Sequence, residues 1–136
     1  MEILGKDVGI VVVDHGSRRA EANAMLEEVV ALFRAHTGYA NVEAAHMELA
    51  EPTLAQAFDR CVARGAQRVI IHPYFLAPGR HSMKDIPELA AAAAAAHPGV
   101  GYMVTAPLGL DVRLAEVMRL RVEAALADSG GRVDSD

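Results

Sequence analysis

Hydrophobic and polar residues alternate in blocks along this chain, and four apolar blocks have the pattern of buried strands. The first, VGIVVVD at residues 8–14, is a continuous β-branched run, as expected for a strand covered on both faces. Three further blocks, at residues 41–48, 68–75 and 100–106, predict the remaining strands. The chain therefore contains four segments that are suited to one sheet.

Helical periodicity fills the intervals between these strands. The apolar positions expected to face the core are Met25, Val29, Leu32 and Phe33 in the first helix, Leu54, Phe58, Cys61 and Val62 in the second, and Leu114, Val117, Met118, Val122 and Leu126 in the last. The third helix is predicted to begin near Asp85, because Asp85 and Glu88 have capping-box spacing and Pro87 suits a first turn.

Strict alternation of strands and helices predicts the fold class. We expect an α/β fold built on a single open parallel four-stranded sheet, with helices on both faces. No internal repeat or long linker divides the sequence. Residues 1–127 are therefore expected to form one domain, and residues 128–136 a flexible polar tail.

Composition narrows the class of protein. Of 136 residues, 52% are hydrophobic and 23% charged, which is the balance of a globular domain. The formal net charge of −5 argues against broad nucleic-acid binding, and no apolar run is long enough to span a membrane. The N-terminus lacks signal-peptide features, so we expect a cytoplasmic protein, or one of the plastid stroma if a transit peptide precedes this sequence.

Polar residues that can take part in catalysis or metal binding lie at or after the ends of the first three predicted strands. His15 follows the first strand, Glu48 ends the second, and His81 lies in the loop after the third. Ligands bind outside the carboxyl ends of the strands in open parallel sheets. These three side chains are therefore expected at one edge of the domain.

The six histidines are not equivalent in their sequence context. His36 and His97 lie near expected helix C-termini, where a partial positive charge is favourable, so a structural role explains them. His46 and His72 fall inside predicted strands and are interpreted as packing residues. His15 and His81 are instead flanked by glycine and arginine. Imidazole binds divalent metals and accepts protons near neutral pH. Glu48 is a candidate third metal ligand, with Glu51 as the alternative carboxylate.

Several anion-binding groups accompany these two histidines. Arg18, Arg19 and Arg80 carry the guanidinium groups that hold carboxylate or phosphate, and Ser17 adds a hydroxyl. Helix N-termini after each loop offer further donors. From the residues alone we expect a cleft for an anionic ligand, with two histidines that bind a divalent metal or move protons.

The phrases HGSRR, MELAEPTL and FLAPGRHSMKDIP together resemble the short sirohydrochlorin chelatases, the CbiX-like class II chelatases. The similarity extends over residues 8–126. The longer phrases DHGSRRAEAN, AHMELAEPTL, HPYFLAPGRH and TAPLGL resemble in particular the plant-type sirohydrochlorin ferrochelatases. The resemblance implies the α/β half-chelatase fold and insertion of a divalent metal into a tetrapyrrole.

The resemblance also implies a role for each candidate. His15 and His81 would bind the metal and accept protons, with His15 the preferred acceptor and Glu48 an auxiliary metal or substrate contact. Residues in contact with the acetate and propionate groups or the ring would be Ser17, Arg18, Arg19, Leu76, Pro78, Gly79 and Arg80. Fe²⁺ or Co²⁺ would be substrate rather than a tightly bound cofactor. Plant-type enzymes carry a cysteine-rich extension with an iron–sulfur cluster, and the single Cys61 predicts none here.

The resemblance leaves three hypotheses about function open. Insertion of Fe²⁺ to make sirohaem is preferred, cobalt insertion for cobalamin synthesis is the alternative, and a non-catalytic metal or tetrapyrrole carrier is a third. A histidine phosphatase is disfavoured, because its phosphate-gripping arginine is replaced here by Asp14. Long class II chelatases contain two such domains, so a chain of half that length is expected to form a homodimer.

Overall fold

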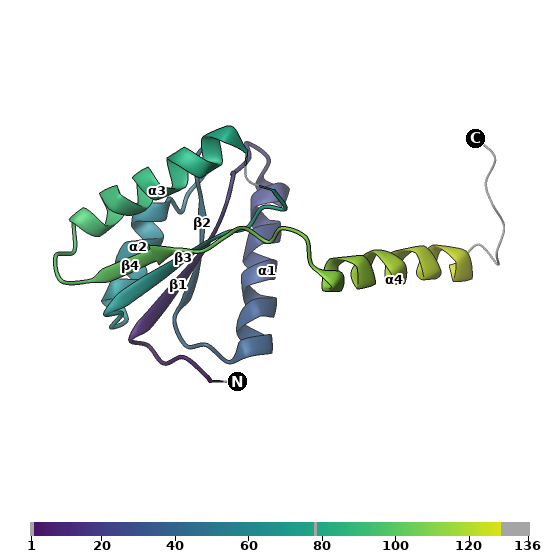
Figure 1. Ribbon diagram of the computed structural model, residues 1–136, viewed down its shortest axis with the longest axis horizontal. Coiled ribbons are helices and arrows are strands. Elements are labelled where there is room, and N and C mark those ends of the chain that lie inside the picture. The colour runs from purple at the N-terminus through teal and green to yellow at the C-terminus, as the bar shows by residue number, and fades with distance from the viewer. Residues whose placement is uncertain (1, 78, 129–136) are drawn as a thin grey trace.

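A computed structural model describes residues 2–77 and 79–128 of the chain (Figure 1). Strands and helices alternate throughout these ranges. They are β1 (Val8–Asp14), α1 (Ala20–Thr37), β2 (Val42–His46), α2 (Leu54–Ala63), β3 (Arg68–Pro73), α3 (Arg80–Ala95), β4 (Gly101–Val104) and α4 (Val112–Asp128). The first strand has the predicted bounds, and the other three are shorter than predicted.

The four strands form one sheet in the order β2-β1-β3-β4, and every neighbouring pair is parallel. Val11 of β1 lies between Glu43 of β2 and Ile71 of β3. The parallel register brings the carboxyl ends of all strands to one edge, which we call the carboxyl edge. The expected α/β architecture is confirmed.

Helices cover the two faces of the sheet unequally. Helices α2 and α3 pack on one face, where the core includes Val11, Phe58, Ile71 and Ile86. Helix α1 packs on the other face, mainly against β1 and β2 (Figure 1). We call these the covered face and the α1 face. The larger core cluster belongs to the covered face.

The buried stripe of α1 differs from the predicted one. Leu26 and Val30 are buried against the sheet, whereas Met25 and Leu32 are exposed. Val29 and Phe33 pack at the margin of the core, as expected. The periodicity was correct, but the stripe faces the sheet about one residue away from its predicted position, because docking on the strands sets the rotation of the helix.

Helix α3 begins five residues earlier than predicted. It starts at Arg80, so Asp85 and Glu88 lie within it, and Pro87 is an internal residue. Proline removes one backbone donor from a helix interior. Packing of Ile86, Ala90 and Ala93 on the covered face stabilises the helix across this position. The predicted capping box at Asp85 is therefore wrong.

Helix α4 extends away from the sheet and the other helices (Figure 1). None of its 17 residues is buried, including the apolar positions predicted to face a core. It ends at Asp128, the first residue of the expected tail, and residues 129–136 lie outside the described ranges. In the described part of the chain, no helix has the length and apolar character needed to cross a membrane.

Candidate active site

Hydrogen bonds join the loops along the carboxyl edge. The Glu48 amide donates to the His15 carbonyl at 3.2 Å, which links the loops after β2 and β1. The Leu108 and Gly109 amides donate to the carbonyls of Phe75 and Leu76, both at 2.9 Å, and link the loops after β4 and β3. These hydrogen bonds hold the four loops along the carboxyl edge in two linked pairs.

His15 lies where the strand order reverses. Its ring stacks on Phe75, with centroids 4.3 Å apart and an interplanar angle of 24°. His15 follows β1 and Phe75 follows β3, so the stack spans the junction at which open α/β sheets bind ligands. Phe75 is buried while His15 is exposed. The His15 imidazole is thus stacked on the buried Phe75 ring while remaining exposed to solvent.

A pair formed by partly buried Asp14 and buried His46 supports the turn that carries His15. Asp14 Oδ1 accepts a hydrogen bond from the Gly16 amide at 3.0 Å and lies 2.6 Å from His46 Nδ1. Gly16 has φ +88°, and a Cβ there would lie 1.9 Å from the Glu48 carbonyl oxygen. Only glycine fits this approach without displacing the neighbouring loop.

Sequence reasoning missed Asp14, His46 and Phe75 as parts of this site. His46 was interpreted as a packing residue, and it is indeed only 2% exposed. The contact between Asp14 and His46 depends on the register of β1 and β2, which no local pattern in the sequence indicates. The contact of Phe75 with His15 likewise depends on the path of the loop after β3.

Glu48 lies beside His15 through its backbone, and its exposed side chain faces α3. A cavity of about 290 Å³ is lined by Met47, Glu48, Asp85, Glu88 and Leu89. Among residues whose side chains the structure describes, no group of three histidine, cysteine or acidic side chains could hold a metal ion. His81 is outside that set. His81 is the second residue of α3, which begins near the carboxyl edge.

The predicted anion-binding residues after β1 are partly engaged with the protein. Ser17 Oγ accepts from the Arg19 amide at 3.0 Å, and its own amide donates to Asn23. The Arg19 guanidinium pairs with Glu21 at 2.8 Å, although its side chain is 77% exposed. Arg18 is exposed. Such exposed pairs are weak, so Arg19 can exchange Glu21 for a carboxylate ligand at small cost.

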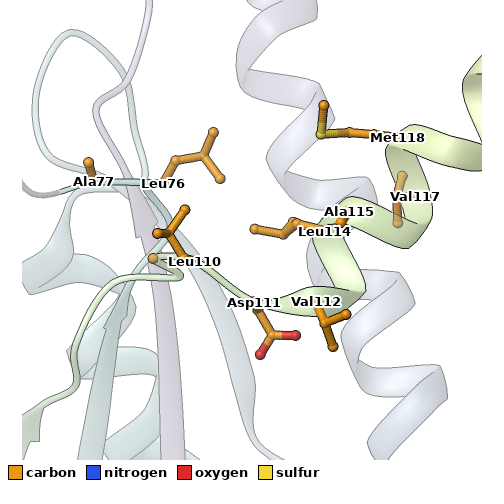
Figure 2. A pocket seen from close by; sticks show the side chains of 10 residues that line it. Leu76, Ala77, Leu110, Asp111, Val112, Leu114, Ala115, Val117 and Met118 are labelled. Carbon is orange, nitrogen blue, oxygen red and sulfur yellow. The ribbon is translucent and has the colours of Figure 1, made fainter.

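The loop between β3 and α3 carries the other predicted contacts. Leu76 is 64% exposed, and Gly79 is also exposed. Arg80 is the first residue of α3. Pro78 lies outside the described residues. Leu76 and Ala77 line an apolar hollow of about 830 Å³ with residues of α4, and Leu114 points toward Leu76 and Leu110 (Figure 2).

The remaining histidines and the cysteine have structural surroundings. His72 Nδ1 lies 2.8 Å from the Thr105 hydroxyl, and burial lowers the pKa of its imidazole. His97 stacks on Phe58 and lies 2.6 Å from Asp59. Cys61 is buried in the core, and burial raises the pKa of its thiol to about 12. A thiol of this kind is a poor nucleophile and metal ligand at neutral pH.

The family model for CbiX matches residues 9–125, which include all of β1 but its first residue and most of α4. The chain belongs to the CbiX family. Within the family, it is 50% identical to the chloroplastic sirohydrochlorin ferrochelatase of Arabidopsis thaliana over 131 residues, or 96% of this chain and 58% of the relative. The resemblance identified from the motifs is confirmed.

Solved CbiX-like structures share the fold. The CbiX protein of Marinobacter aquaeolei VT8 superimposes with a TM-score of 0.76 and 31% identity, over 89% of this chain and 98% of that one. The sirohydrochlorin chelatase SirB of Bacillus subtilis subspecies spizizenii, solved with cobalt, gives 0.79 and 30% identity over 87% of this chain and 50% of SirB. This CbiX chain thus spans somewhat more than half of the plant relative and matches half of SirB.

Proposed function

We propose that this CbiX-family chain is a sirohydrochlorin chelatase that inserts a divalent metal ion into its tetrapyrrole substrate. The stacking of exposed His15 on Phe75, at the strand-order reversal, is the observation that carries the proposal. It offers a proton acceptor held in one orientation beside the loops expected to bind the ring. The 50% identity to the plant ferrochelatase supports the same reaction.

Metal insertion exchanges two pyrrole N–H protons for one divalent ion. In this proposal His15 accepts a pyrrole proton and, being exposed, releases it to water before the second transfer. His81 and neutral His15 would first hold the incoming ion, with Glu48 as an auxiliary carboxylate, and His15 would accept the pyrrole proton only after the ion has passed to the ring nitrogens. Asp14 and His46 keep the His15 turn in place through the Gly16 amide.

The acidic rim of the substrate would be held by the basic loops. Arg18, Arg19 and Arg80 pair with its acetate and propionate groups, and Ser17 donates a hydrogen bond. Leu76 and Pro78 contact the ring, with Gly79 beside them in the same loop. Replacing Arg80 by alanine should raise KM while leaving kcat similar. A large fall in kcat alone would contradict this role.

Iron is the proposed physiological metal, because the chain is 50% identical to a plant ferrochelatase. Cobalt is the second candidate, since SirB of the same fold was solved with cobalt. Imidazole ligands accept both ions, so ligand chemistry does not discriminate between them. Competition between Fe²⁺ and Co²⁺ at limiting sirohydrochlorin, without oxygen, measures the preference directly.

The deciding experiment follows the absorbance change when protein, sirohydrochlorin and Fe²⁺ or Co²⁺ are mixed. We expect a rate well above the protein-free reaction, reduced about 100-fold or more by His15→Ala. His36→Ala, an exposed histidine at the far end of α1, is the matched control and should retain full activity. A rate equal to the protein-free reaction would indicate a carrier instead.

A homodimer is part of the proposal. SirB matches this chain over half its length, which supports two copies here performing the role of two domains in one longer chain. The substrate would then lie between the carboxyl edges of the two copies.

A further inference from the structure

Leu49 is an exposed leucine held in a strained backbone conformation. It follows Glu48 in the loop between β2 and α2, and its φ is +71°. Among the residues that the structure describes, it is the only non-glycine residue with a positive φ. This left-handed conformation crowds the Cβ of an L-residue against the backbone, whereas glycine adopts it freely and asparagine at small cost. The leucine side chain is nevertheless 56% exposed.

Packing within the chain does not explain why a leucine occupies this turn. Neither core cluster formed by the described residues includes Leu49. Glycine or asparagine would form the same turn with less strain. Strained backbone is concentrated at binding sites, where the use of the side chain compensates for its cost. The exposure and the strain of Leu49 together point to a ligand that its side chain contacts.

The loop that carries Leu49 is attached to the turn that carries His15. The Glu48 amide donates to the His15 carbonyl at 3.2 Å. The Glu48 carbonyl, which is bonded to the Leu49 nitrogen, approaches Gly16 so closely that a Cβ there would lie 1.9 Å from the carbonyl oxygen. Leu49 is therefore held beside the turn that presents the exposed imidazole.

A second exposed leucine lies on the other side of His15. The strand order β2-β1-β3 places the loops of Leu49 and Leu76 on the two sides of the His15 loop. Leu76 is 64% exposed and directly follows Phe75, on which the His15 ring stacks. Neighbouring strands are about 4.8 Å apart, so the two outer loops begin roughly 10 Å apart. Two apolar side chains thus flank the imidazole over a width that a flat macrocycle covers.

We infer that Leu49 is a substrate-binding residue that packs against a face of the tetrapyrrole ring. The inference rests on the proposed function and adds a contact to it. A tetrapyrrole has apolar faces and an acidic rim, so leucines suit its faces as arginines suit its rim. With Leu49 and Leu76 against the ring, the pyrrole nitrogens are held close to His15, which accepts their protons.

Substitutions at Leu49 separate a binding role from a structural one. Leu49→Gly relieves the strain and removes the contact, and Leu49→Asn tolerates the left-handed conformation but is polar. Both variants should bind sirohydrochlorin about tenfold more weakly, while the Tm of Leu49→Gly stays unchanged or rises. Leu49→Met, which is also apolar, should keep most of the affinity. A leucine that serves only the fold would give a lower Tm and unchanged binding.

Titration of metal-free sirohydrochlorin, followed by its absorbance, measures Kd without turnover. Leu32→Asn is the matched control, because Leu32 is a 71% exposed leucine of α1, and it should keep the wild-type Kd. Light scattering should give every variant the mass of the wild type. An unchanged Kd in either polar or glycine variant of Leu49, a lower Tm of Leu49→Gly, or an altered mass would overturn the inference.

The same titration distinguishes the ring contact from the chelatase activity on which it rests. A wild type that binds sirohydrochlorin without accelerating metal insertion would contradict the chelatase, while a Leu49→Gly variant that binds about tenfold more weakly would still support the contact. A wild type that catalyses insertion while Leu49→Gly keeps its KM and Kd would contradict the contact alone. A wild type that does not bind sirohydrochlorin would contradict both.

Discussion

The two faces of this sheet are built from similar residues but are covered differently. On the covered face, Val69 and Ile71 of β3 are fully buried beneath α2 and α3. On the α1 face, Ile70 and His72 of the same strand remain partly exposed. Alternating residues of one strand therefore have different environments, because within residues 2–77 and 79–128 α1 covers the α1 face mainly over β1 and β2.

The largest effect should come from matched truncations on adjacent residues of β3. Ile71→Ala leaves a cavity in a packed core and should lower the free energy of unfolding by about 2–5 kcal/mol. Ile70→Ala should cost about 1 kcal/mol in dilute protein, since its side chain is only partly buried. Chemical denaturation measures both. Equal costs under dilute conditions would remove the contrast between the faces.

Two glycines offer the opposite test, in which a methyl group is added. A Cβ on Gly9 would lie 2.7 Å from the Cys61 Cβ on the covered face, so Gly9→Ala should destabilise by about 1–3 kcal/mol. A Cβ on Gly101 of β4 would lie 3.6 Å from the Arg68 Cβ, an ordinary contact. Gly101→Ala should change stability by less than about 0.5 kcal/mol. Thermal unfolding of both variants measures the difference, and a destabilised Gly101→Ala would mean that the β4 edge is tightly packed.

The smallest expected effect is a pH dependence of folding stability that arises from His72 on the α1 face. Burial lowers the pKa of His72 in the folded state, so below its ordinary pKa of 6.5 the unfolded chain binds more protons. Stability should therefore be full above about pH 6.5 and decline as the pH falls toward the lower folded pKa. His72→Gln should reduce this slope in denaturation series between pH 7.5 and 5.5. If the change of stability with pH were the same in His72→Gln as in the wild type, the pH dependence would arise from other groups.

Local signals predicted the elements well where the pattern depended on strand burial alone. VGIVVVD is a strand with the expected bounds, because β-branched residues favour an extended chain and need cover on both sides. The start of α3 was missed, because the capping signal at Asp85 is local while the helix is stabilised by packing from Ile86 to Ala93. Residue propensities indicate roughly where a helix or strand lies, whereas packing contacts determine its first and last residues.

The candidate site was predicted in part. The positions of His15 and Glu48 at one edge follow from strand order, because parallel strands share a carboxyl end. The roles of His15, His81 and Glu48 in metal insertion stay predictions that the assays above address. The support beneath them could not be read from the chain, since Asp14 meets His46, and His15 meets Phe75, only through neighbouring strands and loops.

The sequence by itself determined the alternation of strands and helices, the parallel sheet and the edge that carries the polar loops, because these depend on periodicity and on connections between neighbouring elements. Tertiary structure alone decided which stripe of α1 faces the sheet, which contacts hold the His15 turn, and where α4 points. Those features depend on contacts between residues far apart in the chain. For α4, an amphipathic pattern specifies that an apolar side needs cover, but it does not specify which surface provides it.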